Sequence, residues 1–93
     1  MTDYLDNEVN KGDIVLYNRK GSKGYRSSFA EGVVIRAGGN VIIIEKSKLG
    51  RYKEALEYYK EWKRYPYFAD QKHISNVVNL TALGARERVE LDD

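Results

Sequence analysis

Residues 29–46 read FAEGVVIRAGGNVIIIEK, two β-forming runs separated by a glycine-rich turn. The pattern of Phe29–Arg36 predicts a strand, and Gly32 within it indicates a bulge or a close approach of a neighbouring backbone. The residues expected to share one face of this strand are Phe29, Val33 and Ile35. Ala37–Asn40 (AGGN) is typical of a tight turn between antiparallel strands, and Val41–Lys46 (VIIIEK) follows it as the next strand. The stretch therefore predicts a β-hairpin.

Further strands are predicted on both sides of this hairpin. Ile14–Tyr17 is a β-branched and aromatic run that follows a turn at Asn10–Asp13. Asn18–Ser28 (NRKGSKGYRSS) is too polar and too rich in glycine and serine for a buried element, so we expect a long exposed loop there. His73–Leu80 (HISNVVNL) returns to β-forming residues and is expected to be the last strand.

A change of period over Arg51–Arg64 (RYKEALEYYKEWKR) predicts one substantial helix, inserted before the last strand. One broad face of its helical wheel is apolar and consists of Tyr52, Ala55, Leu56, Tyr58, Tyr59 and Trp62. The opposite face is charged and consists of Lys53, Glu54, Glu57, Lys60, Glu61 and Arg64. Pro66 is expected to stop the helix, because the residue before a proline disfavours the helical region.

The length and composition indicate a single globular domain, since the chain has 93 residues of which 42% are hydrophobic and 32% charged. We expect the core to span residues 9–80. An acidic N-terminal arm, residues 1–8, is expected to be loose. The C-terminal extension, residues 81–93, is expected either to fray or to dock as a short strand around Arg88–Leu91. The predicted fold class is mainly β (α+β), with one inserted amphipathic helix.

The side chains that catalysis or metal binding requires are scarce. The chain has no Cys, which excludes a disulfide, a thiolate metal site and a cysteine nucleophile. His73 is the only histidine, and it has no clearer acid partner than Asp70, so no triad or metal-ligand spacing is present. We therefore expect no enzyme activity, no cofactor and no metal.

No segment predicts a membrane association. The longest apolar run is Val41–Ile44, far shorter than a membrane span. The N-terminal residues lack the basic start and apolar stretch of a signal peptide. We expect a cytoplasmic protein with no membrane partner and no small-molecule substrate.

A family resemblance rests on the opening strand and on the loop and hairpin after it. Lys11–Val15 (KGDIV), then a basic glycine-containing loop, then Glu31–Val34 (EGVV) and a hairpin resemble the SH3-like barrel superfamily, and the opening is most similar to KOW and Tudor-type modules. The resemblance covers residues 9–46 and 73–80. It implies a small closed antiparallel barrel of five strands, with Asn18–Ser28 as the long first loop beside the binding face. The inserted helix departs from this pattern.

The size of the chain also resembles that of many small accessory proteins of bacteriophages. The richness in Tyr and Lys and the absence of Cys belong to the same resemblance. It implies a bacteriophage origin.

A basic surface is the first candidate binding site. Residues 11–72 carry fourteen Lys or Arg against seven Asp or Glu, whereas both chain ends are acidic. The predicted loop combines cations with an aromatic ring, which suits the phosphates and bases of a nucleic acid, and helix cations would assist if the helix lies beside it. The candidate nucleic-acid-binding residues are Arg19, Lys20, Lys23, Tyr25, Arg26, Lys60, Lys63 and Arg64. The alternative interpretation is a loop whose charges serve only solubility.

An aromatic surface is the second candidate. Seven aromatic residues lie between Tyr52 and Phe68, more than one packed helix face requires. Exposed Tyr and Trp are typical anchors of protein interfaces. The candidate interface residues are Tyr58, Trp62, Tyr65 and Tyr67, each of which either packs in the core or remains exposed.

These two surfaces lead to two hypotheses of function. The first is a non-catalytic binding module that associates with nucleic acid through the basic loop. The alternative is a protein–protein interaction module, either a homodimer or an inhibitor of a host enzyme. Cations that converge on one face favour the first hypothesis, and a continuous exposed aromatic patch favours the second.

Overall fold

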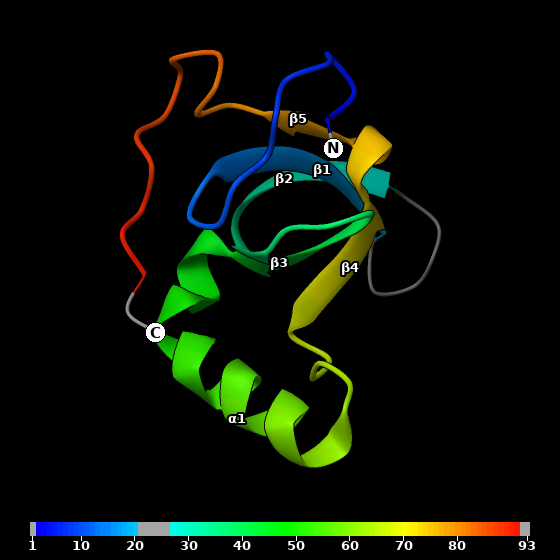
Figure 1. Cartoon of the computed structure of the whole chain (residues 1–93), viewed down its shortest axis with the longest axis vertical. Helices are drawn as coiled ribbons and strands as arrows, with labels where there is room; N and C mark the ends of the chain where they lie inside the picture. The colour runs from blue at the N-terminus through cyan, green and yellow to red at the C-terminus, as the bar shows by residue number, and fades with distance from the viewer. Residues whose placement is uncertain (1, 21–26, 92–93) are drawn as a thin grey trace.

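The chain folds around one five-stranded antiparallel sheet (Figure 1). The computed structural model describes residues 2–20 and 27–91, and only the backbone of residues 19, 20 and 27. In spatial order the strands are β4, β3, β2, β1 and β5. Their bounds are β1 Ile14–Lys20, β2 Ser27–Arg36, β3 Asn40–Glu45, β4 Ala69–His73 and β5 Val77–Asn79. The mainly β class predicted from the sequence is confirmed.

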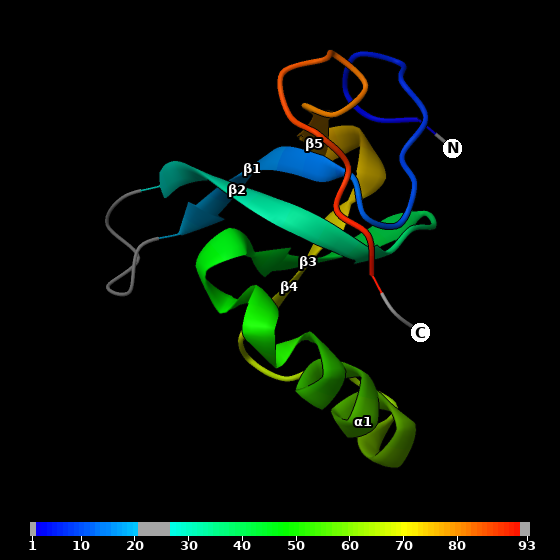
Figure 2. The ribbon, with the colours of Figure 1, turned by 90° about the vertical axis from the view of Figure 1, so that its left-hand side faces the viewer.

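The sheet is strongly curled (Figures 1 and 2). The hydroxyl of Tyr17 on β1 donates a hydrogen bond of 2.9 Å to Oδ2 of Asp70 on β4, although two strands lie between β1 and β4 in sheet order. Tyr17 is fully buried. Its side chain therefore spans the interior of the curled sheet.

Two helices connect β3 to β4. The 3₁₀ helix η1 (Lys46–Arg51) leads directly into α1 (Tyr52–Trp62). The predicted helix is present and precedes the last strand, but a strand that the sequence did not predict, β4, lies between them. Within the part of the chain that the structure describes, no helix is long and apolar enough to cross a bilayer.

The single last strand predicted over His73–Leu80 is three short elements. His73 ends β4, the 3₁₀ helix η2 (Ile74–Asn76) follows, and β5 completes the sheet. The backbone N–H of Ser75 donates a hydrogen bond of 3.2 Å to Nδ1 of His73, which caps η2 and interrupts the strand. The sequence of β4, ADQKH, has weak β propensity and was not predicted as a strand. It forms because its backbone pairs with the edge of β3.

The hairpin of β2 and β3 is confirmed, and Gly32 is a point of close approach within it. A Cβ atom at Gly32 would overlap Cγ2 of Ile43 and lie 2.9 Å from the carbonyl oxygen of Ile44. The irregular register of the hairpin lies further along β2, between Val34 and Arg36. Of the two interpretations of Gly32, the structure therefore supports close packing rather than a bulge.

Strand β3 is buried on both faces, which explains its four consecutive apolar residues. Val41 and Ile43 belong to a first core cluster, and Ile42 and Ile44 belong to a second. The remaining buried members of the first are Val9, Val15, Tyr17, Val34, Ile74 and Val77. Those of the second are Ile35, Tyr52, Ala55 and Phe68. Helix α1 thus covers the second face of β3.

The N-terminal residues, expected to be a loose arm, are held against β5. The backbone N–H groups of Leu5 and Asn7 donate to Oδ1 of Asp3 at 2.9 and 2.8 Å. The N–H of Tyr4 donates to the carbonyl oxygen of Val77 at 2.9 Å. Asp3 is buried, and its carboxylate organises the loop. The acidic composition of this segment did not indicate that one of its carboxylates is buried with several backbone partners.

Asn79 on β5 links this loop to the start of β1. Its Nδ2 donates to Oδ2 of Asp13 at 2.8 Å and to the carbonyl oxygen of Glu8 at 2.9 Å. Its Oδ1 accepts from the N–H of Ala82 at 3.1 Å, and its own N–H donates to Oδ2 of Asp3 at 2.6 Å. Asn79 is completely buried, so these bonds satisfy polar atoms that water does not reach.

The C-terminal extension is docked, although residues 81–91 form no strand. Nε of Arg88 donates to Oδ1 of the buried Asp13 at 2.7 Å, and the N–H of Val89 donates to the carbonyl oxygen of Gly12 at 2.8 Å. Arg86 forms an ion pair of 2.8 Å with Glu31 on β2, and its hydrogen bond lowers the pKa of Glu31 below the ordinary value. In the structure, residues 86–89 contact the rest of the fold through irregular backbone rather than through the strand considered for Arg88–Leu91.

We predict that Asn79→Ala lowers the free energy of unfolding by about 3 kcal/mol, because the substitution leaves buried polar atoms without partners. Urea denaturation followed by circular dichroism measures this change. Asn76→Ala is the matched control, since Asn76 is exposed and is expected to change stability by less than about 0.5 kcal/mol. Equal effects of the two substitutions would contradict a structural role of the Asn79 amide.

Gly32→Ala is expected to destabilise the protein by about 1–3 kcal/mol, because the added methyl group overlaps Ile43 and crowds the backbone of β3. Gly50→Ala is the control. A Cβ atom at Gly50 meets no atom within 4 Å, so this substitution should change stability by less than about 0.5 kcal/mol. Thermal unfolding of both variants compares them, and a Gly32→Ala protein as stable as Gly50→Ala would refute the close approach.

Candidate nucleic-acid interface

Helix α1 ends at a residue with left-handed backbone conformation. Lys63 has φ 58° and ψ 26°, and its N–H donates to the carbonyl oxygen of Tyr59 at 2.8 Å. Residues other than glycine seldom adopt this conformation, so the sequence does not reveal it. The helix therefore stops two residues before the predicted end at Arg64, and Pro66 is not the direct cause.

A groove of about 570 Å³ lies between this end of α1 and the turn that joins β2 to β3. Its cations come from two elements, since Arg36 ends β2 and Lys63 and Arg64 follow α1. Among the residues that the structure describes, those that line the groove include these three cations and no carboxylate. Two tyrosines, Tyr59 and Tyr65, also line it. We call it the cationic groove.

The guanidinium of Arg36 is held in place by the two tyrosines. Its Cζ lies 5.4 Å from the ring centroid of Tyr59, and that ring stacks on Tyr65 with a centroid distance of 4.5 Å. Hydrogen bonding to Tyr59, and then to Tyr65, raises the pKa of Arg36 above its ordinary value. Arg36 therefore presents a permanent positive charge from a fixed position.

The sequence-based prediction missed Arg36 and Tyr59. Arg36 is the last residue of β2, before the glycine-rich turn, and its place in the sequence did not indicate that the end of α1 lies beside it. Tyr59 was assigned only to the apolar face of the helix. Lys63 and Arg64, which were among the predicted nucleic-acid-binding residues, line the cationic groove together with Arg36.

The predicted loop cations lie outside the side chains that the structure describes. Lys23, Tyr25 and Arg26 lie outside the described residues, and the side chains of Arg19 and Lys20 are not described. The backbone of this loop joins β2 at Ser27, whereas the cationic groove lies at the other end of this ten-residue strand. Of the helix cations, Lys60 is exposed, and its Nζ lies 3.5 Å from Oε1 of Glu57.

The four candidate interface aromatics are divided among three places. Tyr58 and Trp62 are 6.3 Å apart between ring centroids, and Trp62 is 56% exposed. Tyr65 is partly buried in its stack within the cationic groove. Tyr67 is 84% exposed and lies near Arg51 at the other end of α1. They do not form one continuous patch.

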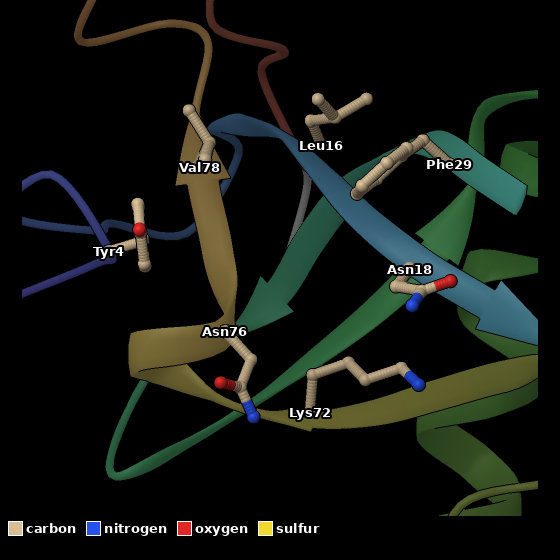
Figure 3. Close-up of a pocket in the computed structure, with 7 residues that line it drawn as sticks. All are labelled: Tyr4, Leu16, Asn18, Phe29, Lys72, Asn76 and Val78. Atoms are coloured by element: carbon tan, nitrogen blue, oxygen red, sulfur yellow. The ribbon is translucent and has the colours of Figure 1, made fainter. Parts of the chain in front are cut away.

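A second groove of about 570 Å³, which we call the aromatic groove, opens where β1, β4 and β5 meet (Figure 3). Its lining residues are Tyr4, Leu16, Asn18, Phe29, Lys72, Asn76 and Val78. Phe29 was expected to share a face with the buried Val33 and Ile35, yet it is 72% exposed. The second core cluster reaches β2 only at Ile35, so no layer covers Phe29.

Strand β4 separates the two grooves. Gln71 lines the cationic groove, and the next residue, Lys72, lines the aromatic groove. Successive side chains of a strand point to opposite faces, which explains this division. β4 is also an edge strand of the sheet.

The only histidine has a structural contact. His73 is exposed, and its Nδ1 lies 2.7 Å from the hydroxyl of Ser75. Within residues 2–20 and 27–91, no group of three His, Cys, Asp or Glu side chains has an arrangement that could hold a metal ion.

Comparison with known proteins identifies the family. Residues 1–71 match the domain of unknown function DUF7205. The chain belongs to this family. No curated protein and no solved structure gives a significant match. The DUF7205 match includes all residues of the cationic groove, whereas Lys72, Asn76 and Val78 of the aromatic groove follow it.

Lys63→Gly is expected to raise the free energy of unfolding by about 1 kcal/mol, because glycine adopts the left-handed conformation without steric cost. Lys63→Ala is the matched control, since it removes the same charge but keeps the steric cost. Urea denaturation of the two variants separates backbone strain from charge. Equal stability of both variants would show that the conformation of Lys63 stores no strain.

Proposed function

We propose that this protein is a non-catalytic module that binds nucleic acid through the cationic groove. The observation that carries the proposal is the meeting of Arg36, Lys63 and Arg64 in a groove whose lining, within the described residues, has no carboxylate. Guanidinium and ammonium groups bind phosphate oxygens, and arginine does so with a fork of two N–H donors. The groove thus offers an electrostatic site for an anionic backbone.

The tyrosines support a nucleic acid over a single small anion. The Tyr59–Tyr65 stack extends along the groove beside Arg36, and aromatic rings with cations are the combination that contacts both sugar–base and phosphate groups. The first-loop residues, Arg19, Lys20, Lys23, Tyr25 and Arg26, remain part of the proposal. They would add a sequence-independent attraction at the Ser27 end of β2.

We further propose that the curled sheet is an SH3-like barrel. Three observations support this assignment: the five short antiparallel strands, the pairing of the first strand with the last, and the hydrogen bond from Tyr17 on β1 to Asp70 on β4. The cationic groove would then lie at the inserted helix, away from the first loop of the barrel.

The protein–protein hypothesis has one specific observation in its favour. Trp62 is more than half exposed on the part of α1 that extends away from the sheet (Figure 2). An exposed Trp of this kind is a typical interface anchor. The wide separation of Trp62 from Tyr67 makes this the second candidate, with a second copy of the chain or a host enzyme as the partner.

The salt dependence of binding tests the proposed function. We expect log K for a fluorescently labelled oligonucleotide to fall linearly with log salt concentration, because binding releases counterions. Replacing Arg36, Lys63 and Arg64 together by Ala should reduce the magnitude of the slope by about 2–3, or about 0.7–0.9 for each lost phosphate contact. Fluorescence anisotropy titrations at several salt concentrations measure both quantities.

The control is a second triple variant, which loses three positive charges outside the cationic groove. Lys46, Lys48 and Lys53 lie on η1 and α1 and do not line the cationic groove. Their joint replacement by Ala should change the slope by much less than the groove variant. Equal effects of the two triple variants would reject the groove as the site, and absence of binding by the native protein at low salt would reject the function.

A further inference from the structure

The aromatic groove has no part in the phosphate contacts proposed above, yet its rim exposes two aromatic side chains. Phe29 is 72% and Tyr4 is 73% exposed, and both border a groove lined further by the partly buried Leu16 and Val78 (Figure 3). Tyr4 is held there by the hydrogen bond from its N–H to Val77. The groove therefore has apolar surfaces on which a planar ring can stack.

The polar groups of the aromatic groove suit the edge of a base. Asn18 and Asn76 are exposed at the groove, and the described part of the chain provides no hydrogen-bond partner for either side-chain amide. A carboxamide has donors and an acceptor in one plane, which match the donor and acceptor pattern of a base edge. Lys72 adds a positive charge beside them.

The position of the groove relates it to the cationic groove. Gln71 and Lys72 are consecutive on the edge strand β4 and line the two grooves on its opposite faces. A chain that lies in one groove has to cross only this strand to enter the other. Positive charge lies on both sides of the crossing, at Arg36, Lys63 and Arg64 on one side and at Lys72 on the other.

From this arrangement we infer that the ligand is single-stranded nucleic acid, with an unstacked base in the aromatic groove and neighbouring phosphates in the cationic groove. The inference rests on the proposed function and names its substrate class. A duplex does not satisfy the arrangement, because its bases are paired and stacked and cannot enter a side groove. Single strands provide both a flexible anionic backbone and free base faces.

The test compares one oligonucleotide of mixed sequence, about 12 nucleotides long, as a single strand and annealed to its complement. Anisotropy titrations should show that the native protein binds the single strand at least about tenfold more tightly. Phe29→Ala and Tyr4→Ala should each weaken single-strand binding by about tenfold through lost stacking, with duplex binding unchanged. Phe29→Tyr keeps the ring and should retain the affinity.

Tyr67→Ala is the matched control, because Tyr67 is an exposed aromatic residue outside both grooves. It should leave both affinities unchanged. Circular dichroism verifies that each variant is folded. As an independent readout, the side-chain amide signals of Asn18 and Asn76 in ¹⁵N-edited NMR spectra of the native protein should shift with the single strand and not with the duplex.

The outcomes separate this inference from the proposed function. Equal binding of single strand and duplex, or equal effects of Phe29→Ala and Tyr67→Ala, would overturn the inference and leave the phosphate-binding function standing. Amide signals that do not move on addition of the single strand would also overturn it. If the native protein binds neither the single strand nor the duplex at low salt, the proposed function is rejected, and the inference is rejected with it.

Discussion

The buried carboxamide of Asn79 is the interaction on which the rest of the structure depends. It joins the N-terminal loop, the start of β1 and the turn after β5 through bonds to Glu8, Asp13 and Ala82, while the Asn79 backbone N–H bonds to Asp3. Buried polar atoms require partners, so these segments must come together if any one of them is buried. The same Asp13 binds Arg88, which extends the network to the C-terminal residues. The short strand β5 is thereby held in the sheet despite its three residues.

Burial of β3 on both faces then places the cationic groove. Because Ile42 and Ile44 require a cover, η1 and α1 must pack on that face after the chain leaves β3. The helix is anchored there by Tyr52 and Ala55 near its start, and its far end and the turn between β2 and β3 border the same groove. Three cations from two separate elements meet as a result. The groove is a consequence of apolar packing, while its charge comes from residues that packing does not require.

In the proposed binding mode, the two grooves lie on opposite faces of one edge strand and have different roles. The cationic groove would provide attraction that salt screens, whereas the aromatic groove would provide stacking and base-edge contacts that salt affects little. A two-faced edge strand suits a flexible ligand, because a rigid helix of nucleic acid could occupy only one side. The hydrogen bond from the hydroxyl of Tyr17 to Asp70 links β1 to β4. Both of these strands contribute residues to the aromatic groove, so this hydrogen bond helps to hold the groove in shape.

Local sequence by itself determined the β2–β3 hairpin, β1 and the amphipathic helix, because periodicity and turn residues act over a few neighbouring positions. At Gly32 it left a bulge and a close approach as alternatives, and the contact with β3 decided between them. Tertiary structure alone decided β4, whose polar sequence becomes a strand only by pairing with β3, and the docking of both chain ends through Asp3, Asp13 and Asn79. It likewise decided that Arg36 joins the helix cations and that Phe29 is exposed. These features depend on contacts between residues distant in sequence, and composition or spacing does not encode such contacts.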